Sequence, residues 1–371
     1  MKQTELLKLL TAQGIDLDDV GQVDKIRSTR KVEDETGATW TVSFSPKWEQ
    51  APAWQPVRPA AAVKVTGAKA VKPSTDGLTT LFLFPDTQIG FHRDPQTGEL
   101  VPMHDTGAID VGLQILESLK TVDAVGYAGD QLDLTDMSKF VSEPAAAQNT
   151  QAAIDWCHKF MAIARKITPH ARHDLMEGNH DMRLAKYITM NAKAAYGLKK
   201  AGAAPDAWPE LSVPNLLRLD ELDVTYHVGF PAAMCWYRDD LAMEHGKTIN
   251  PKSLGKKTAI SRLMGHVHRL EAQSHTLQTG KNTVSRSLTV AFGTMSRVDG
   301  AVPSFGSGVD GNGMPVKNVE DWAQGCAVLT YDENDVGGPI TYELIPIHEG
   351  TAIHRGRRFE AGKWFDKVVP L

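Results

Sequence analysis

The stretch HDLMEGNHD, residues 173–181, ends a short apolar run with an amide, an imidazole and a carboxylate in succession, Asn179, His180 and Asp181. An apolar run of this length bounded by glycine is typical of a buried strand. Two earlier stretches, LTTLFLFPD (78–86) and VDAVGYAGD (122–130), also end on an aspartate. Polar side chains with metal-binding or acid–base chemistry therefore collect where predicted strands end.

The apolar pattern between and beyond these strands predicts the fold class. Helical spacing over 107–120 and 146–167 separates the three strands, and the chain after the third strand is rich in strand patterns. Strands that alternate with helices, followed by a strand-rich half, predict a layered α/β fold.

The chain is expected to contain more than this domain. Residues 1–50 predict a small module of one helix and a β-hairpin, and 51–77 is an Ala/Pro-rich stretch expected to form an extended linker. The main domain is predicted over 78–350, and 351–371 is a basic and aromatic tail.

Composition narrows the classes of function. The 371 residues carry a formal net charge of −5, which excludes a protein that coats nucleic acid through bulk basicity but permits a local basic groove. Three widely spaced cysteines match no zinc spacing and no disulfide framework, which indicates a reducing compartment. With no apolar run long enough for a signal peptide or a membrane span, we expect a cytoplasmic protein.

Seven potential metal ligands follow apolar runs along the chain. Each offers a hard oxygen or an imidazole, the donors that Mn, Fe, Co, Ni or Zn accept. They are Asp86, Gln88, Asp130, Asn179, His245, His266 and His268. Taken singly, such an aspartate is more often a turn former and such a histidine more often a solvated one.

Together these residues resemble the motifs of the calcineurin-like metallophosphoesterases, with later stretches similar to the phage and mobile-element branch, distantly like double-strand-break-repair nucleases. The motifs occur in the family's order: D-x-Q at 86–88, G-D-x-x-D at 129–133, G-N-H-D at 178–181, H-G at 245–246 and G-H-V-H at 265–268. Five ordered motifs favour the family strongly over chance. The resemblance implies two packed β-sheets flanked by helices.

The resemblance also implies two divalent metal ions. One would be held by Asp86, Gln88, Asp130 and His268, and the other by Asp130, Asn179, His245 and His266. A hydroxide bridging the ions would attack the phosphorus, and His180 would protonate the leaving group as general acid.

Two neighbours of His180 are further catalytic candidates. Asp181 could orient the imidazole and raise its pKa, or it could be favourable only with the dipole of a following helix. Arg183 could clamp phosphate oxygens, and its alternative is an ordinary solvated cation.

Gln88 departs from the family, which usually has His at this position. An amide oxygen is a weaker donor than imidazole, so the first metal should bind less tightly and favour Mn over Zn. We therefore expect Mn²⁺, with Fe, Zn, Ni or Co as alternatives.

The substrate expected from the resemblance is a phosphodiester in DNA, RNA or a nucleotide, since the chain lacks the Arg of the phosphoprotein-phosphatase motif. The alternative function is a scaffold that keeps the fold and has lost turnover, which Gln88 favours. Basic stretches at 247–257 and 354–367 are candidates for nucleic-acid contact, with a tail docked on the core as the alternative for the second. The Gly-rich stretch 305–322 is expected to be a flap by the site.

Overall fold

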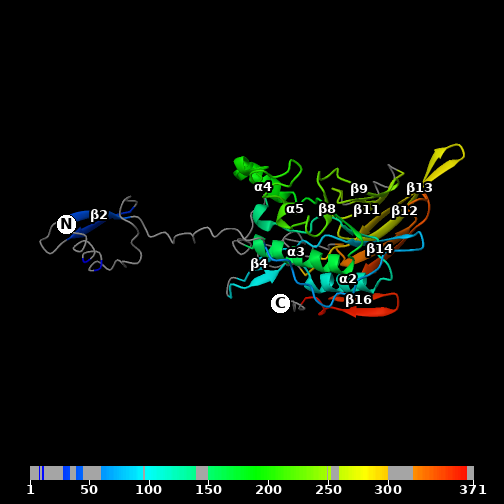
Figure 1. Ribbon diagram of the computed structural model, residues 1–371, viewed down its shortest axis with the longest axis horizontal. Helices are drawn as coiled ribbons and strands as arrows, with labels where there is room; N and C mark the ends of the chain where they lie inside the picture. The colour runs from blue at the N-terminus through cyan, green and yellow to red at the C-terminus, as the bar shows by residue number, and fades with distance from the viewer. Residues whose placement is uncertain are drawn as a thin grey trace, which may run out of the picture. The chain divides into compact units, whose positions relative to one another are not determined.

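The structure is a computed structural model. It describes Lys8, Thr11, the backbone of 28–33 and 39–44, and residues 60–94, 97–138, 149–248, 250–251, 259–299 and 321–365. The chain divides into two compact units, residues 1–62 and 63–371 (Figure 1).

The first unit contains an antiparallel hairpin. Strands β1 (Ser28–Glu33) and β2 (Thr39–Phe44) pair with Ser28 opposite Phe44. Both strands were expected from the sequence, and the turn between them lies outside the described residues.

The second unit is built on two β-sheets. The order of the six-stranded sheet is β15 (Ile340–Pro346), β14 (Gly325–Tyr331), β3 (Thr79–Phe84), β6 (Ala124–Tyr127), β7 (Arg172–Met176) and β8 (Val224–His227). Strands β3, β6, β7 and β8 are parallel, and β14 and β15 are antiparallel additions at one edge. The order of the five-stranded sheet is β12 (Leu270–Gly280), β13 (Thr283–Phe292), β11 (Ser261–Met264), β10 (Leu241–Glu244) and β9 (Cys235–Arg238).

The six-stranded sheet is buried on both faces, which explains the uninterrupted apolar sequence of β3. Because side chains alternate along a strand, Leu81 and Leu83 pack toward the five-stranded sheet, against residues such as Met243. Phe82 and Phe84 pack on the opposite face, in the core shared with the helices. The predicted layered α/β fold with two packed sheets and flanking helices is confirmed.

Helices connect the parallel strands and cover one face of the six-stranded sheet. They are α2 (Thr106–Ser118), α3 (Thr150–Ile167), α4 (Arg183–Asn191) and α5 (Val213–Leu216), with 3-10 turns η2 (Thr135–Met137) and η4 (Lys193–Ala195). Helix α2 begins where Asp105 caps it, since the Asp105 carboxylate accepts the backbone N–H of Ala108 at 2.8 Å.

Part of the stretch expected as linker packs against the second unit. Val71 is buried, and its N–H donates to the carbonyl of Ile167 at 2.7 Å. The N–H of Ser74 donates to the Asp123 carboxylate at 2.7 Å. The compact structure therefore includes residues before the boundary predicted at 77.

The C-terminal tail is docked through its aromatic side chains. Strands β16 (Thr351–His354) and β17 (Arg357–Glu360) form a hairpin that buries Phe359, and the ring of Phe365 stacks on Trp156 with centroids 4.3 Å apart. The described tail therefore follows the second reading of its sequence, in which the aromatics pack on the core.

Strands β4 (Phe91–Arg93) and β5 (Leu100–Pro102) form a short hairpin after the first motif.

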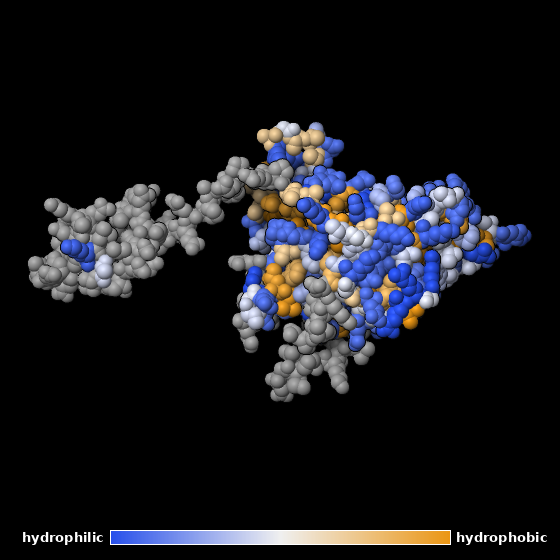
Figure 2. All heavy atoms as spheres, turned by 60° about the horizontal axis from the view of Figure 1, so that its bottom comes forward, coloured by the Kyte–Doolittle hydropathy of each residue, from blue (hydrophilic) through white to orange (hydrophobic). Residues whose placement is uncertain are grey.

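All three cysteines are free and buried. No helix among the described residues is both long and apolar enough to cross a membrane. The face drawn in Figure 2 is mainly hydrophilic, with apolar side chains gathered in limited patches.

Candidate metal centre

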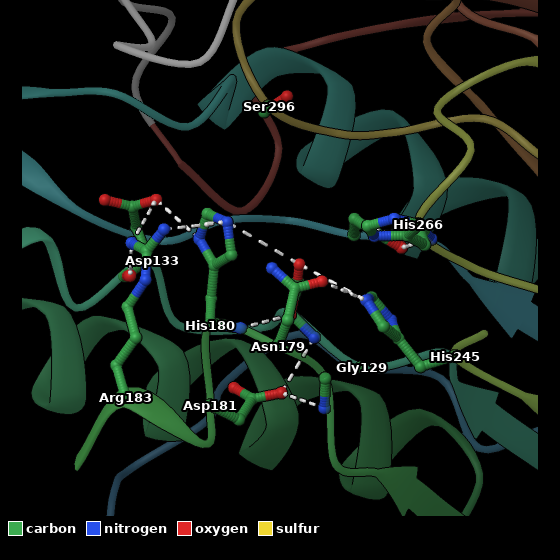
Figure 3. Close-up of polar contacts among 12 residues, drawn as sticks. Gly129, Asp133, Asn179, His180, Asp181, Arg183, His245, His266 and Ser296 are labelled. Carbon is green, nitrogen blue, oxygen red and sulfur yellow. Dashed lines mark hydrogen bonds and ion pairs between the residues drawn. The ribbon is translucent and has the colours of Figure 1, made fainter. Parts of the chain in front are cut away.

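The five motifs meet where the carboxyl ends of strands from both sheets come together. Asp86 follows β3, Asp130 follows β6 and Asn179 follows β7, and these three parallel strands are neighbours. From the second sheet, His245 follows β10 and His266 follows β11, which are also parallel neighbours. The carboxyl ends of parallel strands lie at one edge, so side chains far apart in the sequence converge there (Figure 3).

One half of the centre gathers around Asp130. The Nε2 atom of His245 lies 3.3 Å from Asp130 Oδ2 and 3.0 Å from Asn179 Oδ1. Potential ligand atoms of Asp130, His245 and His266 all lie within 4.8 Å of one another. These four residues are the predicted ligands of the second metal ion, and the structure brings them together.

The other half gathers around Asp86, which is fully buried. His268 Nε2 lies 3.0 Å from Asp86 Oδ2, and the backbone N–H of His266 donates to the same oxygen at 2.9 Å. The Gln88 N–H donates to the carbonyl of Asp130 at 2.9 Å, which ties the first motif to the second. Asp86 and His268 are therefore in direct contact, and Gln88 is joined to Asp130 through its backbone.

The imidazole of His245 is held in the orientation that a metal ligand needs. Its Nδ1 lies 2.8 Å from the carbonyl oxygen of Ala128, which can only accept, so Nδ1 carries the proton and Nε2 faces Asp130. Burial lowers the pKa of His245, but the charges of Asp130 and Asp86 outweigh it and raise the pKa to about 10. A cation at this place would substitute for the second ring proton.

The donor set fits divalent cations. The side-chain oxygen of Gln88 is buried and has no hydrogen-bond partner among the described residues, and the same holds for His268 Nδ1. Burial alone would raise the pKa of Asp130, yet His245 and His180 hold it well below its usual range. An ionised buried carboxylate, an unpaired amide oxygen and imidazoles are ligands for Mn²⁺ and similar ions.

His180 lies beside the ligand cluster and contacts a carboxylate of its own. Its Nδ1 is 2.8 Å from Asp133 Oδ1, and its Nε2 is 3.8 Å from Asp130 Oδ2. Burial lowers the pKa of His180, but Asp130 and Asp133 together raise it above its ordinary value. The ring is thus oriented by Asp133 next to the predicted metal ligands, and the two carboxylates favour its protonated form.

Arg183 packs on this pair. Its Nη1 donates to the carbonyl of Asp133 at 2.6 Å, and its Nη2 lies 3.1 Å from His180 Nε2 (Figure 3). The Arg183 side chain therefore lies beside the predicted metal ligands, and its contacts in this structure are with His180 and Asp133.

Of the two roles expected for Asp181, orienting His180 does not match its contacts in the structure. Its Oδ2 accepts the backbone N–H groups of Asp130 and Gly178 at 2.7 and 3.0 Å, and its Oδ1 accepts that of Leu132 at 3.2 Å. Burial and the charge of Asp130 raise the pKa of Asp181 to about 7. Asp181 thus fixes the loop that carries Asp130, while Asp133 orients His180.

Asp133 was not among the catalytic residues expected from the sequence. The available signal was its place as the second aspartate of G-D-x-x-D. Sequence adjacency favoured Asp181 because it directly follows His180, but the partner of His180 comes from the neighbouring strand's loop.

Two motif glycines are required by close approach. A Cβ at Gly178 would lie 2.0 Å from Asp130 Oδ1, and one at Gly265 would lie 2.7 Å from Asp86 Oδ1. Any side chain at these positions would push a predicted metal ligand out of place.

The backbone of the site is strained. Four predicted ligands have positive φ, namely Gln88 (45°), Asp130 (49°), His266 (65°) and His268 (56°). This region is disfavoured for residues with a Cβ, and such strain concentrates at functional sites.

A second group of potential ligands is already neutralised by an arginine. Asp174, His227 and Cys235 lie close together, but Arg172 Nε is 2.7 Å from Asp174 Oδ2 and its Nη2 is 3.1 Å from Cys235 Sγ. The Arg172 guanidinium therefore supplies the positive charge that a bound cation would bring to Asp174.

Two predicted stretches fall largely outside the described residues. The basic stretch 247–257 is described only at 247–248 and 250–251, and the Gly-rich stretch 305–322 only at 321–322. Trp322 packs edge-to-face on His268, with ring centroids 4.1 Å apart. The end of the predicted flap therefore contacts the metal centre.

No family model matches the chain, and no curated protein matches it. Among solved structures it is similar to a purple acid phosphatase from yellow lupin (Lupinus luteus) seeds, with 10% identity and TM-score 0.32 over 82% of this chain and 54% of that one. It is also similar to a 5'-nucleotidase precursor from Thermus thermophilus, with 13% identity and TM-score 0.28 over 72% of this chain and 53% of that one. A third is the NAD nucleotidase of Haemophilus influenzae (10%, 0.29, 72% and 55%). The chain spans about half the length of these structures, and at this similarity the comparison assigns it no substrate.

Proposed function

We propose that the chain is a metal-dependent phosphoesterase of the calcineurin-like superfamily that hydrolyses phosphodiester bonds in nucleic acid or nucleotides. The observation that carries the proposal is the convergence of six residues with oxygen and nitrogen donors, from loops after strands of two sheets, beside a His–Asp pair. Placement in the phage-type branch, Mn²⁺ as the native metal and a cytoplasmic location stay predictions from the sequence.

The ligand roles follow the two halves of the centre. Asp86, Gln88 and His268 would hold one ion, and Asn179, His245 and His266 the other, with Asp130 between them. When bound, the ions neutralise phosphate charge and lower the pKa of water at the site. The buried carboxylates position the ions, and the Gln88 amide gives the first ion a neutral donor.

The chain's own residues supply the proton for the leaving group. His180 presents Nε2 toward the metal ligands, because Asp133 holds its Nδ1. Donation of the Nε2 proton to the departing oxygen leaves a neutral imidazole, with its remaining proton shared with Asp133. Arg183 Nη2 lies 3.1 Å from this nitrogen and can only donate, so a protonated Nε2 requires the guanidinium to move off it when substrate binds.

The test compares Mn-loaded enzyme on bis-p-nitrophenyl phosphate and p-nitrophenyl phosphate. We expect diester hydrolysis by the wild type, and its loss with metal binding in Asp130→Asn. His180→Ala should lower kcat by roughly 10²- to 10⁴-fold while its metal content stays at the wild-type value. His170→Ala, which removes an exposed histidine outside the site, is the matched control.

Asp133→Asn tests whether Asp133 acts on the reaction through its contact with His180. This variant should lower kcat toward that of His180→Ala with little change in KM. The reason is that it leaves the predicted metal ligands in place but weakens the contact that orients the His180 imidazole. A wild-type protein that binds Mn and hydrolyses neither ester would sink the proposal and favour the scaffold.

A further inference from the structure

The segment that follows G-N-H-D differs in charge from the rest of the chain. Residues 182–205 contain no Asp or Glu, although the whole protein has a formal net charge of −5. The basic residues of this segment are Arg183, Lys186, Lys193, Lys199 and Lys200. A locally positive surface on an acidic protein is the electrostatic footprint of a polyanion site.

The same segment leaves large apolar side chains in solvent. Met190 is 79% exposed, Tyr196 61% and Tyr187 44%. They lie on α4, which stands at the outer edge of the second unit, and just beyond η4 (Figure 1). Clustered exposed aromatic and apolar groups mark a binding surface. Aromatic rings that alternate with lysines suit a nucleic acid, because bases stack on the rings and phosphates pair with the lysines.

Helical geometry connects this surface to the catalytic pair. Arg183, Tyr187 and Met190 fall on one stripe of α4 because residues three, four and seven apart share a face. Leu184 and Ile188 are buried on an adjacent face, about 100° round the helix, and anchor it. The stripe begins at Arg183, which contacts His180, and runs about 10 Å along the helix away from it.

We propose that this α4 surface, formed by Arg183, Lys186, Tyr187, Met190, Lys193 and Tyr196, binds a single-stranded nucleic acid and leads it into the metal centre. The inference rests on the proposed function and names its substrate class. A single strand is favoured over a duplex because its bases are free to stack on Tyr187 and Tyr196 while its phosphates meet the lysines. A protein partner of matching charge is the competing occupant.

The experiment measures binding of a fluorescein-labelled oligothymidylate to the full chain by anisotropy at several salt concentrations. Tyr187→Ala and Tyr196→Ala should each weaken binding by at least about fivefold. Lys186→Ala and Lys193→Ala should each weaken binding and flatten the slope of log K against log salt by about 0.7. Tyr342→Ala and Lys281→Ala, exposed positions on β15 and at the β12–β13 turn, are matched controls with wild-type binding.

The outcomes separate this inference from the proposed function. If the wild type hydrolyses the small diester but all four surface variants bind the oligonucleotide as it does, the inference is wrong and the proposed function stands. If Met190→Glu instead abolishes self-association seen by sedimentation, without affecting the oligonucleotide, the surface is an interface between copies of the chain. Absence of small-diester hydrolysis overturns the proposed function itself, whatever the oligonucleotide does.

Discussion

At the scale of single residues, the site includes a position, Gly178, where close contacts leave no room for a side chain. A methyl group at Gly178 would overlap Asp130, since the added Cβ would lie 2.3 Å from its backbone nitrogen. Gly178→Ala should therefore displace the ligand between the two ions and lower kcat/KM for the diester by about 100-fold, as ångström-scale misplacement does. Gly280→Ala, where the nearest atom is 3.4 Å from the added Cβ, should keep wild-type kinetics.

A substitution at Gln88 is expected to strengthen metal binding. Replacing Gln88 by His puts imidazole in place of the amide, and His tolerates the positive φ of 45° better than most residues. We expect Gln88→His to tighten binding of the first ion by roughly tenfold and to shift preference from Mn toward Zn. Calorimetric titration of the two metals measures this, and equal affinities in the two proteins would show that Gln88 is not a ligand.

The same scale shows where prediction from sequence ends. That the candidate ligands lie together could be predicted, because their residue types and their order along the chain carry that information. The choice between Asp181 and Asp133 as the partner of His180 could not, because it depends on how two loops from neighbouring strands approach each other.

At the scale of elements, the apolar pattern predicted what local sequence determines. The predicted strands and helices lie where the apolar pattern indicated them, namely β3, β6, β7, α2 and α3. Burial on both faces of the sheet selects apolar runs for the strands, and the helices show helical apolar spacing. Docking of the tail could not be read in this way. Its basic and aromatic composition suits either nucleic acid or the core, and only tertiary contacts decide.

The docked hairpin makes a stability prediction. Phe359 is 2% exposed, so Phe359→Ala should lower the free energy of unfolding by about 3 kcal/mol in a denaturant titration. Ile353→Ala on the same hairpin removes a side chain that is 69% exposed, and should cost less than about 0.5 kcal/mol. Equal effects of the two substitutions would mean that the hairpin is not docked in solution.

At the scale of the whole molecule, folding and metal binding should be coupled. The centre joins loops from both sheets, so ions that bind only the folded chain stabilise the packing of one sheet on the other. At 100 times Kd, one site contributes about 2.7 kcal/mol, so Mn²⁺ should raise the Tm of chelator-treated protein by at least about 4 °C. Asp130→Asn should show little of this shift, and an unchanged wild-type Tm would argue against a folded-state metal site.

The residues that converge at the edges of the two sheets are proposed to hold two divalent ions and to hydrolyse phosphodiesters. The most direct measurement titrates chelator-treated protein with Mn²⁺ and follows bis-p-nitrophenyl phosphate hydrolysis together with bound metal per chain. We predict that the rate rises with bound metal and reaches its plateau at about two ions, as expected for a two-metal site. Full activity without added metal, or no hydrolysis once two ions are bound, would contradict it.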